Sequence, residues 1–123
     1  MKSKFIGMIV PDISNTFFSS LAYSAQDYLQ KQGYNLLICS STNQVDTEKA
    51  HFANLAEFGV AGILCVSGLS SMPENLLNEN VPLVFLDRRP SNAEKIFWVV
   101  NDDVEATRLA TQFLIDKGCK IFL

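Results

Sequence analysis

Histidine and cysteine are scarce in this 123-residue sequence, and each scarcity excludes a class of site. His51 is the only histidine, so a multi-histidine metal site lacks ligands, and we expect His51 to be solvated or to cap a helix. The three cysteines, Cys39, Cys65 and Cys119, are never spaced as C-x-x-C, which argues against a zinc site or a disulfide framework. Cys39 and Cys65 lie in apolar runs and are predicted to be small buried hydrophobes. We expect no metal and no cofactor.

Basic clusters and long apolar runs are also missing. The net charge is −3 and Arg88–Arg89 is the only adjacent basic pair, so the chain itself lacks the concentrated basic face that nucleic-acid phosphates need. No apolar run approaches the roughly 18 residues of a membrane span, and the amino terminus lacks the cleavage site of a signal peptide. These absences predict a cytoplasmic protein with no membrane partner.

Three motifs of enzymes and nucleotide-binding proteins are absent. The sequence contains no G-x-G-x-x-G, no G-x-x-x-x-G-K-[ST] and no G-x-S-x-G, so it offers neither a glycine cradle for phosphates nor an elbow for a serine nucleophile. One enzymatic alternative stays open, in which Asp12 accepts a phosphoryl group. That chemistry needs magnesium and further carboxylates, and only Asp87 is well placed to join Asp12. We therefore expect no enzyme.

The most informative stretch that is present is PDISNTFF, at residues 11–18. It follows the apolar run at 5–10, which is long enough for a buried strand. Ser14 or Asn15 can cap a helix that then opens with two aromatic residues. This strand-to-helix turn carries an amide, a hydroxyl, a carboxylate and two rings, which suits a small-molecule site.

Strands and helices alternate along the rest of the chain. Predicted strands cover 5–10, 34–39, 62–66, 83–86 and 97–100, and 121–123 begin another. The predicted helices run from Ser14 or Asn15 to Gly33, from Asp46 or Thr47 to Gly59, from a Ser71–Glu74 capping box, and from Asp102 or Asp103 to Gly118. This order predicts an α/β fold with three α/β/α layers around a mainly parallel sheet.

Apolar residues at three- and four-residue steps predict which face each long helix buries. The inward residues expected are Phe18, Leu21, Ala22, Ala25, Tyr28 and Leu29 in the first helix, Ala50, Phe52, Ala53, Leu55 and Ala56 in the second, and Ala106, Leu109, Ala110, Phe113 and Leu114 in the last.

Polar loops follow four of the predicted strands, at 11–15, 40–44, 67–71 and 87–90. The carboxyl ends of parallel strands meet at one edge of the sheet, where α/β proteins bind ligands. That edge is expected to gather Asn15, Phe17, Ser67, Asp87 and Arg88. Amide, carboxylate and guanidinium groups suit the hydroxyls of a sugar, and an aromatic ring suits its apolar face.

Each candidate also has a purely structural alternative. Asn15 can act as a helix cap and still meet a ligand through other atoms. Phe18 continues the buried stripe of the first helix, so it is expected nearer the core than Phe17. Asp87 and Arg88, as an isolated surface pair, would be solvated and would contribute little to stability.

The stretch IGMIVPDISNTFF, at residues 6–18, resembles the opening of the effector domain of LacI/GalR-family transcriptional regulators. The family's order and spacing continue in GYNL at 33–36, VAGIL at 60–64, VPLVFLDR at 81–88, and DD at 102–103 leading to LIDKG at 114–118. Three positions depart from the family pattern: Thr16 stands where proline is usual, Asp103 where asparagine is, and Cys119 where histidine is.

The resemblance implies a type I periplasmic-binding-protein-like fold, with one subdomain at 5–120, a linker remnant at 1–4 and the start of a second subdomain at 121–123. It implies that a sugar-like effector is clamped between the two subdomains and that the parent regulator is a homodimer. It also implies that DNA is contacted only through a helix-turn-helix preceding this chain. The effector contacts it implies are Asn15, Phe17, Phe18, Asp87 and Arg88. A sugar-binding protein of an ABC importer, which shares the fold, is the alternative.

Overall fold

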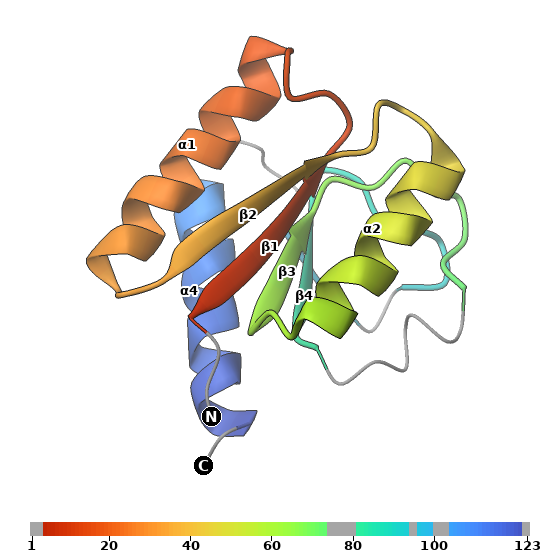
Figure 1. Cartoon of the computed structure of the whole chain (residues 1–123). Helices are drawn as coiled ribbons and strands as arrows, with labels where there is room; N and C mark the ends of the chain where they lie inside the picture. The colour runs from red at the N-terminus through yellow and green to blue at the C-terminus, as the bar shows by residue number, and fades with distance from the viewer. Residues whose placement is uncertain (1–3, 74–80, 94–95, 100–103, 122–123) are drawn as a thin grey trace.

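A computed structural model of the chain describes residues 4–73, 81–93, 96–99 and 104–121 (Figure 1). Within them, a five-stranded parallel sheet has the order β2-β1-β3-β4-β5. The strands are β1 (Phe5–Val10), β2 (Asn35–Ser40), β3 (Gly62–Cys65), β4 (Leu83–Leu86) and β5 (Phe97–Val99), and the helices are α1 (Thr16–Lys31), α2 (Val45–Phe58) and α4 (Val104–Ile121). Helices on both faces of a parallel sheet confirm the predicted three-layer fold.

Strand β1 is the centre of the topology because the chain leaves it in two directions. It pairs with β2 through the α1 crossover, and α2 then carries the chain back to place β3 on the other side of β1. As Figure 1 shows, α1 and α4 lie side by side on one face of the sheet and α2 lies on the other. The carboxyl ends of β1 and β3 therefore flank the point where strand order reverses, the usual ligand position in open α/β sheets.

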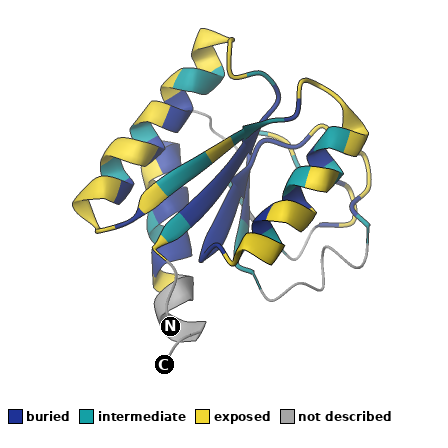
Figure 2. Ribbon diagram, in the orientation of Figure 1, coloured by how far each residue is buried: buried dark blue, intermediate teal, exposed yellow. Residues whose placement is uncertain are grey.

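The sheet divides the core into two layers, because successive side chains of a strand point to opposite faces. In β1, Ile6, Met8 and Val10 pack toward α1 and α4, whereas Ile9 packs toward α2. Burial is nearly continuous along β1, β3 and β4 (Figure 2). Central parallel strands require such unbroken apolar runs, which is why the predictions at 5–10, 62–66 and 83–86 match these strands to within one residue.

Glycines end both α1 and α2 where the sequence predicted. Gly33 has φ of 84°, and its N–H donates to the carbonyl oxygen of Gln30 at 3.2 Å. The N–H of Tyr34 donates to the carbonyl oxygen of Leu29 at 2.9 Å, which completes a Schellman cap. Gly59 has φ of 88° at the end of α2. A side chain is strained at these angles, so glycine fixes both helix ends.

The start predicted for α2 is wrong. The helix begins at Val45, and Gln44 is the N-cap with no side-chain capping bond, whereas Asp46 or Thr47 was expected to cap it. The N–H of Glu48 already donates to the carbonyl oxygen of Gln44 at 3.0 Å, so the first helical turn closes two residues earlier than the polar side chains suggested.

The buried face of α2 also differs from the prediction. Phe52 and Leu55 are buried, but Ala56 is half-buried and Ala50 and Ala53 are exposed. The third buried residue is Glu48, one helical turn before Phe52. Glu48, Phe52 and Leu55 therefore form this face, at positions i, i+4 and i+7. The prediction considered apolar residues only, so it missed Glu48.

Strand β2 was predicted at 34–39 as a buried strand. It spans Asn35–Ser40 and lies at the edge of the sheet among the described strands, so none of its residues is fully buried. Cys39 is accordingly half-buried, against the prediction, while Cys65 in central β3 is buried as predicted. Strand β5, predicted at 97–100 as an edge strand, lies at the opposite edge of the described sheet.

Helix α4 is longer than predicted. It continues through Gly118 to Ile121, where the sequence suggested a helix end and then a strand. Glycine inside a helix costs about 1 kcal/mol relative to alanine, which weakens a helix without forbidding it. The predicted caps at 102–103, and most of the short helix predicted after Ser71, lie outside the described residues.

The inward faces predicted for α1 and α4 are largely confirmed. Buried residues include Leu21, Ala22, Ala25 and Leu29 in α1 and Ala106, Ala110 and Leu114 in α4, and Phe18, Tyr28 and Phe113 are half-buried. Leu109 is wrong, since it is 51% exposed. Thr107 and Thr111 are buried instead, and the hydroxyl of Thr111 donates to the carbonyl oxygen of Thr107 at 2.7 Å.

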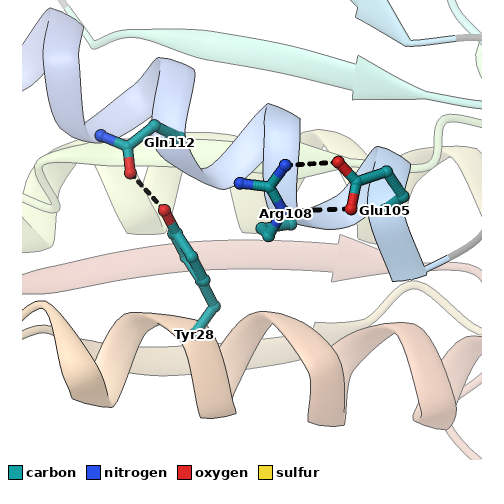
Figure 3. A network of polar contacts seen from close by, with 4 residues as sticks. All are labelled: Tyr28, Glu105, Arg108 and Gln112. Atoms are coloured by element: carbon teal, nitrogen blue, oxygen red, sulfur yellow. Dashed lines mark hydrogen bonds and ion pairs between the residues drawn. The ribbon is translucent and has the colours of Figure 1, made fainter.

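A polar network links α1 to α4 at the surface (Figure 3). The hydroxyl of Tyr28 bonds to the side-chain oxygen of Gln112, and Arg108 forms an ion pair with Glu105 one turn earlier. The Arg108 guanidinium donates two hydrogen bonds to the Glu105 carboxylate, which lowers the pKa of Glu105 from its ordinary value. Exposed pairs of this kind contribute little to stability, so the burial beneath them holds α4 in place.

Candidate functional site

The turn between β1 and α1 is built from short-range hydrogen bonds. Asp12 Oδ1 accepts from the backbone N–H and the hydroxyl of Ser14, at 3.0 and 2.6 Å. Asn15 is the N-cap of α1, and its Oδ1 accepts from the N–H of Phe17 at 2.9 Å. The N–H of Ile13 donates to the hydroxyl of Ser40 at 3.3 Å, which ties the turn to the end of β2. The capping alternative for Asn15 is therefore confirmed, and it uses Oδ1 alone.

The Asp12 carboxylate makes this turn sensitive to acid. The Ser14 hydroxyl, followed by the Ser14 N–H, lowers the pKa of Asp12 from its ordinary value. A depressed folded-state pKa stabilises the fold above pH of about 4, and that contribution is lost as the pH falls through the folded pKa. We expect Ser14→Ala to raise the pKa of Asp12, measured by carboxyl NMR titration, with Ser20→Ala as an exposed control. An unchanged Asp12 pKa in Ser14→Ala would contradict the contact.

The two aromatic residues at the start of α1 differ in burial. Phe17 is 41% exposed, whereas Phe18 is half-buried and packs on the core layer beneath α1. Their ring centroids are 5.2 Å apart at an interplanar angle of 74°, an edge-to-face contact. Phe18 thus lies nearer the core than Phe17, as its place in the buried stripe predicted. The Phe17 ring contacts Phe18 and stays partly exposed to solvent.

A pocket of about 510 Å³ opens at the carboxyl ends of β3, β4 and β5. Its lining residues come from the turn after β3, the loop after β4 and one side chain of β5: Ser67, Gly68, Leu69, Ser70, Asp87, Arg88, Arg89, Pro90, Ser91 and Trp98. This volume is in the range of small-molecule sites, and the sheet edge is the one at which ligands were expected.

Asp87 occupies an unusual backbone conformation at the rim of this pocket. Its φ is 64°, and the N–H of Arg88 donates to the carbonyl oxygen of Leu86 at 2.6 Å around it. The N–H of Asp87 donates to the Val99 carbonyl oxygen at 2.9 Å, and its own carbonyl oxygen accepts from the Trp98 indole N–H at 3.2 Å. Left-handed angles are costly outside glycine and persist where neighbours hold them, often at functional sites.

The charged groups of Asp87 and Arg88 lie at the pocket without an ion pair between them. Within the described part of the chain, neither the Asp87 carboxylate nor the Arg88 guanidinium takes part in an ion pair, even with each other. Arg89 is placed differently, with its guanidinium carbon 4.2 Å from the centre of the Trp98 ring, a cation–π contact. Arg88 is exposed and Asp87 half-buried, so the alternative that both charges are solvated stays open.

The structure brings together only some of the predicted site residues. Asp87 and Arg88 share the pocket with Ser67, across β3 and β4. Asn15 and Phe17 lie at the end of β1, at the same sheet edge, and are not among the residues lining this pocket. The described site is thus centred on β3 and β4, with the β1 turn beside it.

Glu48 is a site residue that the sequence analysis missed. It is 2% exposed and reaches from α2 to the turn after β3. Its Oε2 accepts from the Ser67 hydroxyl at 2.6 Å and its Oε1 from the Gly68 N–H at 2.8 Å, while the Cys65 thiol lies 3.8 Å from Oε2. Burial, helped by the Glu48 charge, raises the pKa of Cys65 well above its ordinary value, so that thiol stays protonated. The available signal was the spacing of Glu48 from Phe52.

Asn92 is a second missed residue, and it joins the two loops of the pocket. Its Oδ1 accepts from the N–H of Met72, and its Nδ2 donates to the carbonyl oxygen of Met72, both at 2.8 Å. Beside it, the N–H and hydroxyl of Ser91 donate to the carbonyl oxygen of Ser70 at 2.9 and 3.0 Å. Hydrogen bonds of Glu48 and Asn92 therefore fix the two loops that form the pocket wall.

Two further findings bear on other kinds of site. Among the described residues, no group of three or more histidine, cysteine or acidic side chains is placed to hold a metal ion. His51 is half-buried, with Nε2 3.0 Å from the carbonyl oxygen of Ser40, instead of being solvated or capping a helix as predicted. In the part of the chain that the structure covers, no helix has both the length and the apolar character needed to cross a bilayer.

Comparison with known proteins gives consistent matches. A family model described as periplasmic binding proteins and sugar binding domain of LacI family matches residues 3–121. The chain is 32% identical over 119 residues to the ribose operon repressor of Halalkalibacterium halodurans, covering 96% of this chain and 35% of that protein. It is 35% identical over 118 residues to catabolite control protein A of Staphylococcus epidermidis, covering 95% of this chain and 36% of that protein.

A solved structure with a bound sugar also matches. It is a periplasmic binding protein/LacI transcriptional regulator from Alkaliphilus metalliredigens, complexed with D-xylulofuranose. The TM-score is 0.71 at 25% identity, over 98% of this chain and 54% of that one. The chain spans about a third of the length of the two curated relatives it was compared with.

Proposed function

Since this chain belongs to the family of periplasmic binding proteins and LacI-type sugar-binding domains, we propose that it is one lobe of the effector-sensing domain of a transcriptional regulator. The effector we propose is a sugar or a similar small polyol. In the complete regulator, a second lobe would close over the ligand and so bias a dimer whose separate DNA-binding parts read the operator. One of the two curated relatives is a ribose operon repressor and the other a catabolite control protein, which favours a regulator over an importer's binding protein.

The observation that carries this proposal is the pair of charged side chains at the rim of the pocket, neither of which forms an ion pair among the residues that the structure describes. Asp87 can accept and Arg88 can donate, so together they suit a hydroxyl group that does both. Phe17, on the neighbouring turn, can offer its exposed ring to the apolar face of a sugar. We assign Asn15 a supporting role there, through the amide group that its cap leaves unused.

We expect this chain to bind sugars weakly by itself. The described pocket supplies one wall, and losing about three hydrogen bonds from a second lobe, at about 1 kcal/mol each, weakens affinity on the order of a hundredfold. Amide NMR spectra recorded during titration with D-ribose, D-xylulose and the nucleobase hypoxanthine should show sugar-dependent shifts at residues 67–70 and 87–91. Micromolar binding of a sugar would contradict the single-lobe proposal.

Variants at the pocket rim test the site itself. Arg88→Ala and Asp87→Asn should each weaken sugar binding by about tenfold, the worth of one charge-assisted hydrogen bond. Asparagine tolerates the left-handed backbone angle of Asp87, so that variant removes charge with little added strain. Arg108→Ala, which removes an exposed arginine from α4, is the control. Equal binding by Arg88→Ala and Arg108→Ala would overturn the assignment.

A further inference from the structure

The hydrogen bonds around Glu48 fix which way the donors of the β3 turn point. A serine hydroxyl has one donor and two acceptor sites. Ser67 uses its donor on Glu48 and one acceptor site on the N–H of Leu69, at 3.0 Å. The Gly68 N–H is also directed at Glu48. The donors of Ser67, Gly68 and Leu69 are therefore committed inside the protein, and Ser67 itself is 2% exposed.

The opposite side of the pocket carries an acceptor and a donor, the Asp87 carboxylate and the Arg88 guanidinium. Arg88 carries a guanidinium whose N–H groups are all donors, and it has no ion-pair partner within the described residues. A ligand hydroxyl can accept from Arg88 and donate to Asp87. A phosphate oxygen can only accept, so the β3 turn offers it none of the donors of Ser67, Gly68 and Leu69, and the charge of Glu48 lies buried behind that turn.

We infer that Glu48 is a positioning residue that withholds the donors of the β3 turn from the pocket and so selects neutral hydroxyl-bearing ligands over anionic ones. This inference rests on the proposed function and specifies its ligand class. Glu48 acts through Ser67 and Gly68. Its contribution has two parts, the orientation of the Ser67 hydroxyl and the negative charge held behind it.

Glu48→Gln tests both parts with a side chain of the same shape. The glutamine NH₂ group can donate to Ser67, which releases the Ser67 hydroxyl as a donor from its bond to Glu48, and the charge is gone. D-ribose and D-ribose 5-phosphate are the probes, and their affinities are compared for each protein by amide NMR titration. We expect wild type to prefer D-ribose. In Glu48→Gln, the dissociation constant for D-ribose 5-phosphate divided by that for D-ribose should fall about fivefold.

A purely structural role for Glu48 predicts a different result. Loosening the turn would weaken both probes equally and leave their ratio unchanged. Glu57→Gln is the matched control, because Glu57 is an exposed glutamate on the same helix. It should leave both affinities and their ratio unchanged. An unchanged ratio in Glu48→Gln, while wild type binds D-ribose, would overturn the inference and leave the proposed function standing.

Two further measurements cover the remaining outcomes. In wild type, the amide proton of Gly68 should resonate at low field because it donates to a carboxylate, and it should move upfield in Glu48→Gln whether or not a ligand binds. Ser67→Ala keeps the Glu48 charge and the Gly68 bond to it, so this variant should still prefer D-ribose, and equal affinities for the two probes would contradict the inference. This variant tests the inference even where Glu48→Gln fails to fold. Wild type that binds neither probe would overturn the proposed function and this selectivity together.

Discussion

Phe85→Ala is expected to lower the free energy of unfolding by about 3–5 kcal/mol, the range for truncating a fully buried phenylalanine. Phe85 is 0% exposed in central strand β4, where it packs in the core layer beneath α2. The side chain is too large for its neighbours to fill the cavity it would leave. Urea unfolding monitored by circular dichroism gives the value directly, provided that the slope with denaturant stays that of wild type.

Phe58→Ala is the matched control for this change. Phe58 is 59% exposed at the end of α2, where its ring meets Phe5 edge-on at a centroid distance of 5.5 Å. Its loss should stay within about 1 kcal/mol, the worth of one exposed aromatic contact. Similar losses at Phe85 and Phe58 would contradict the packing described here. Because Phe85 lies two residues before Asp87, the core variant should also broaden the amide signals of the pocket rim.

Gly7→Val is expected to destabilise the protein by about 2–3 kcal/mol through overpacking. A Cβ atom at Gly7 would lie 2.7 and 2.9 Å from the two terminal methyl carbons of Leu55, a buried residue of α2. The close approach at Gly7 sets how near α2 can lie to the sheet. Displacing α2 would also pull Glu48 away from the pocket wall, so this variant should move the Gly68 amide signal as well as the unfolding midpoint.

A double-mutant cycle isolates the contact. Leu55→Ala removes the methyl groups that a valine at position 7 would meet and leaves a cavity that the valine can partly fill. The double variant should therefore be more stable than the sum of the single changes predicts, by about 1 kcal/mol or more. Additive losses would show that Gly7 is needed for some reason other than its approach to Leu55.

Three features were predictable from the sequence because each depends on near neighbours along the chain. Strand β1 is an unbroken apolar run closed by Pro11, and its predicted bounds match those observed. Gly33 and Gly59 end their helices because only glycine adopts their φ angles without strain. Cap and core roles for Asn15 and Phe18 also followed from their positions in the first turn of α1.

The misplaced features depend on partners far away in the sequence. Cys39 and Cys65 sit in similar apolar runs, but one strand lies at the sheet edge and the other at its centre, so their burial differs. Leu109 is exposed, whereas Thr107 and Thr111 on the neighbouring face of α4 are buried. A local sequence pattern determines neither the order of the strands in the sheet nor which face of a helix turns toward the core.

The pocket shows most clearly which features depend on local sequence and which depend on distant partners. The sequence by itself determined the parallel α/β fold, the edge at which its loops gather and the candidacy of Asp87 and Arg88, because hydrophobic period and turn chemistry are local properties. Only the tertiary structure decided that Asp87 takes a left-handed angle held by Trp98, and that a glutamate is buried behind Ser67. A buried charge and a strained angle are stable only where distant groups supply their hydrogen bonds, and those groups are brought together by the folded chain.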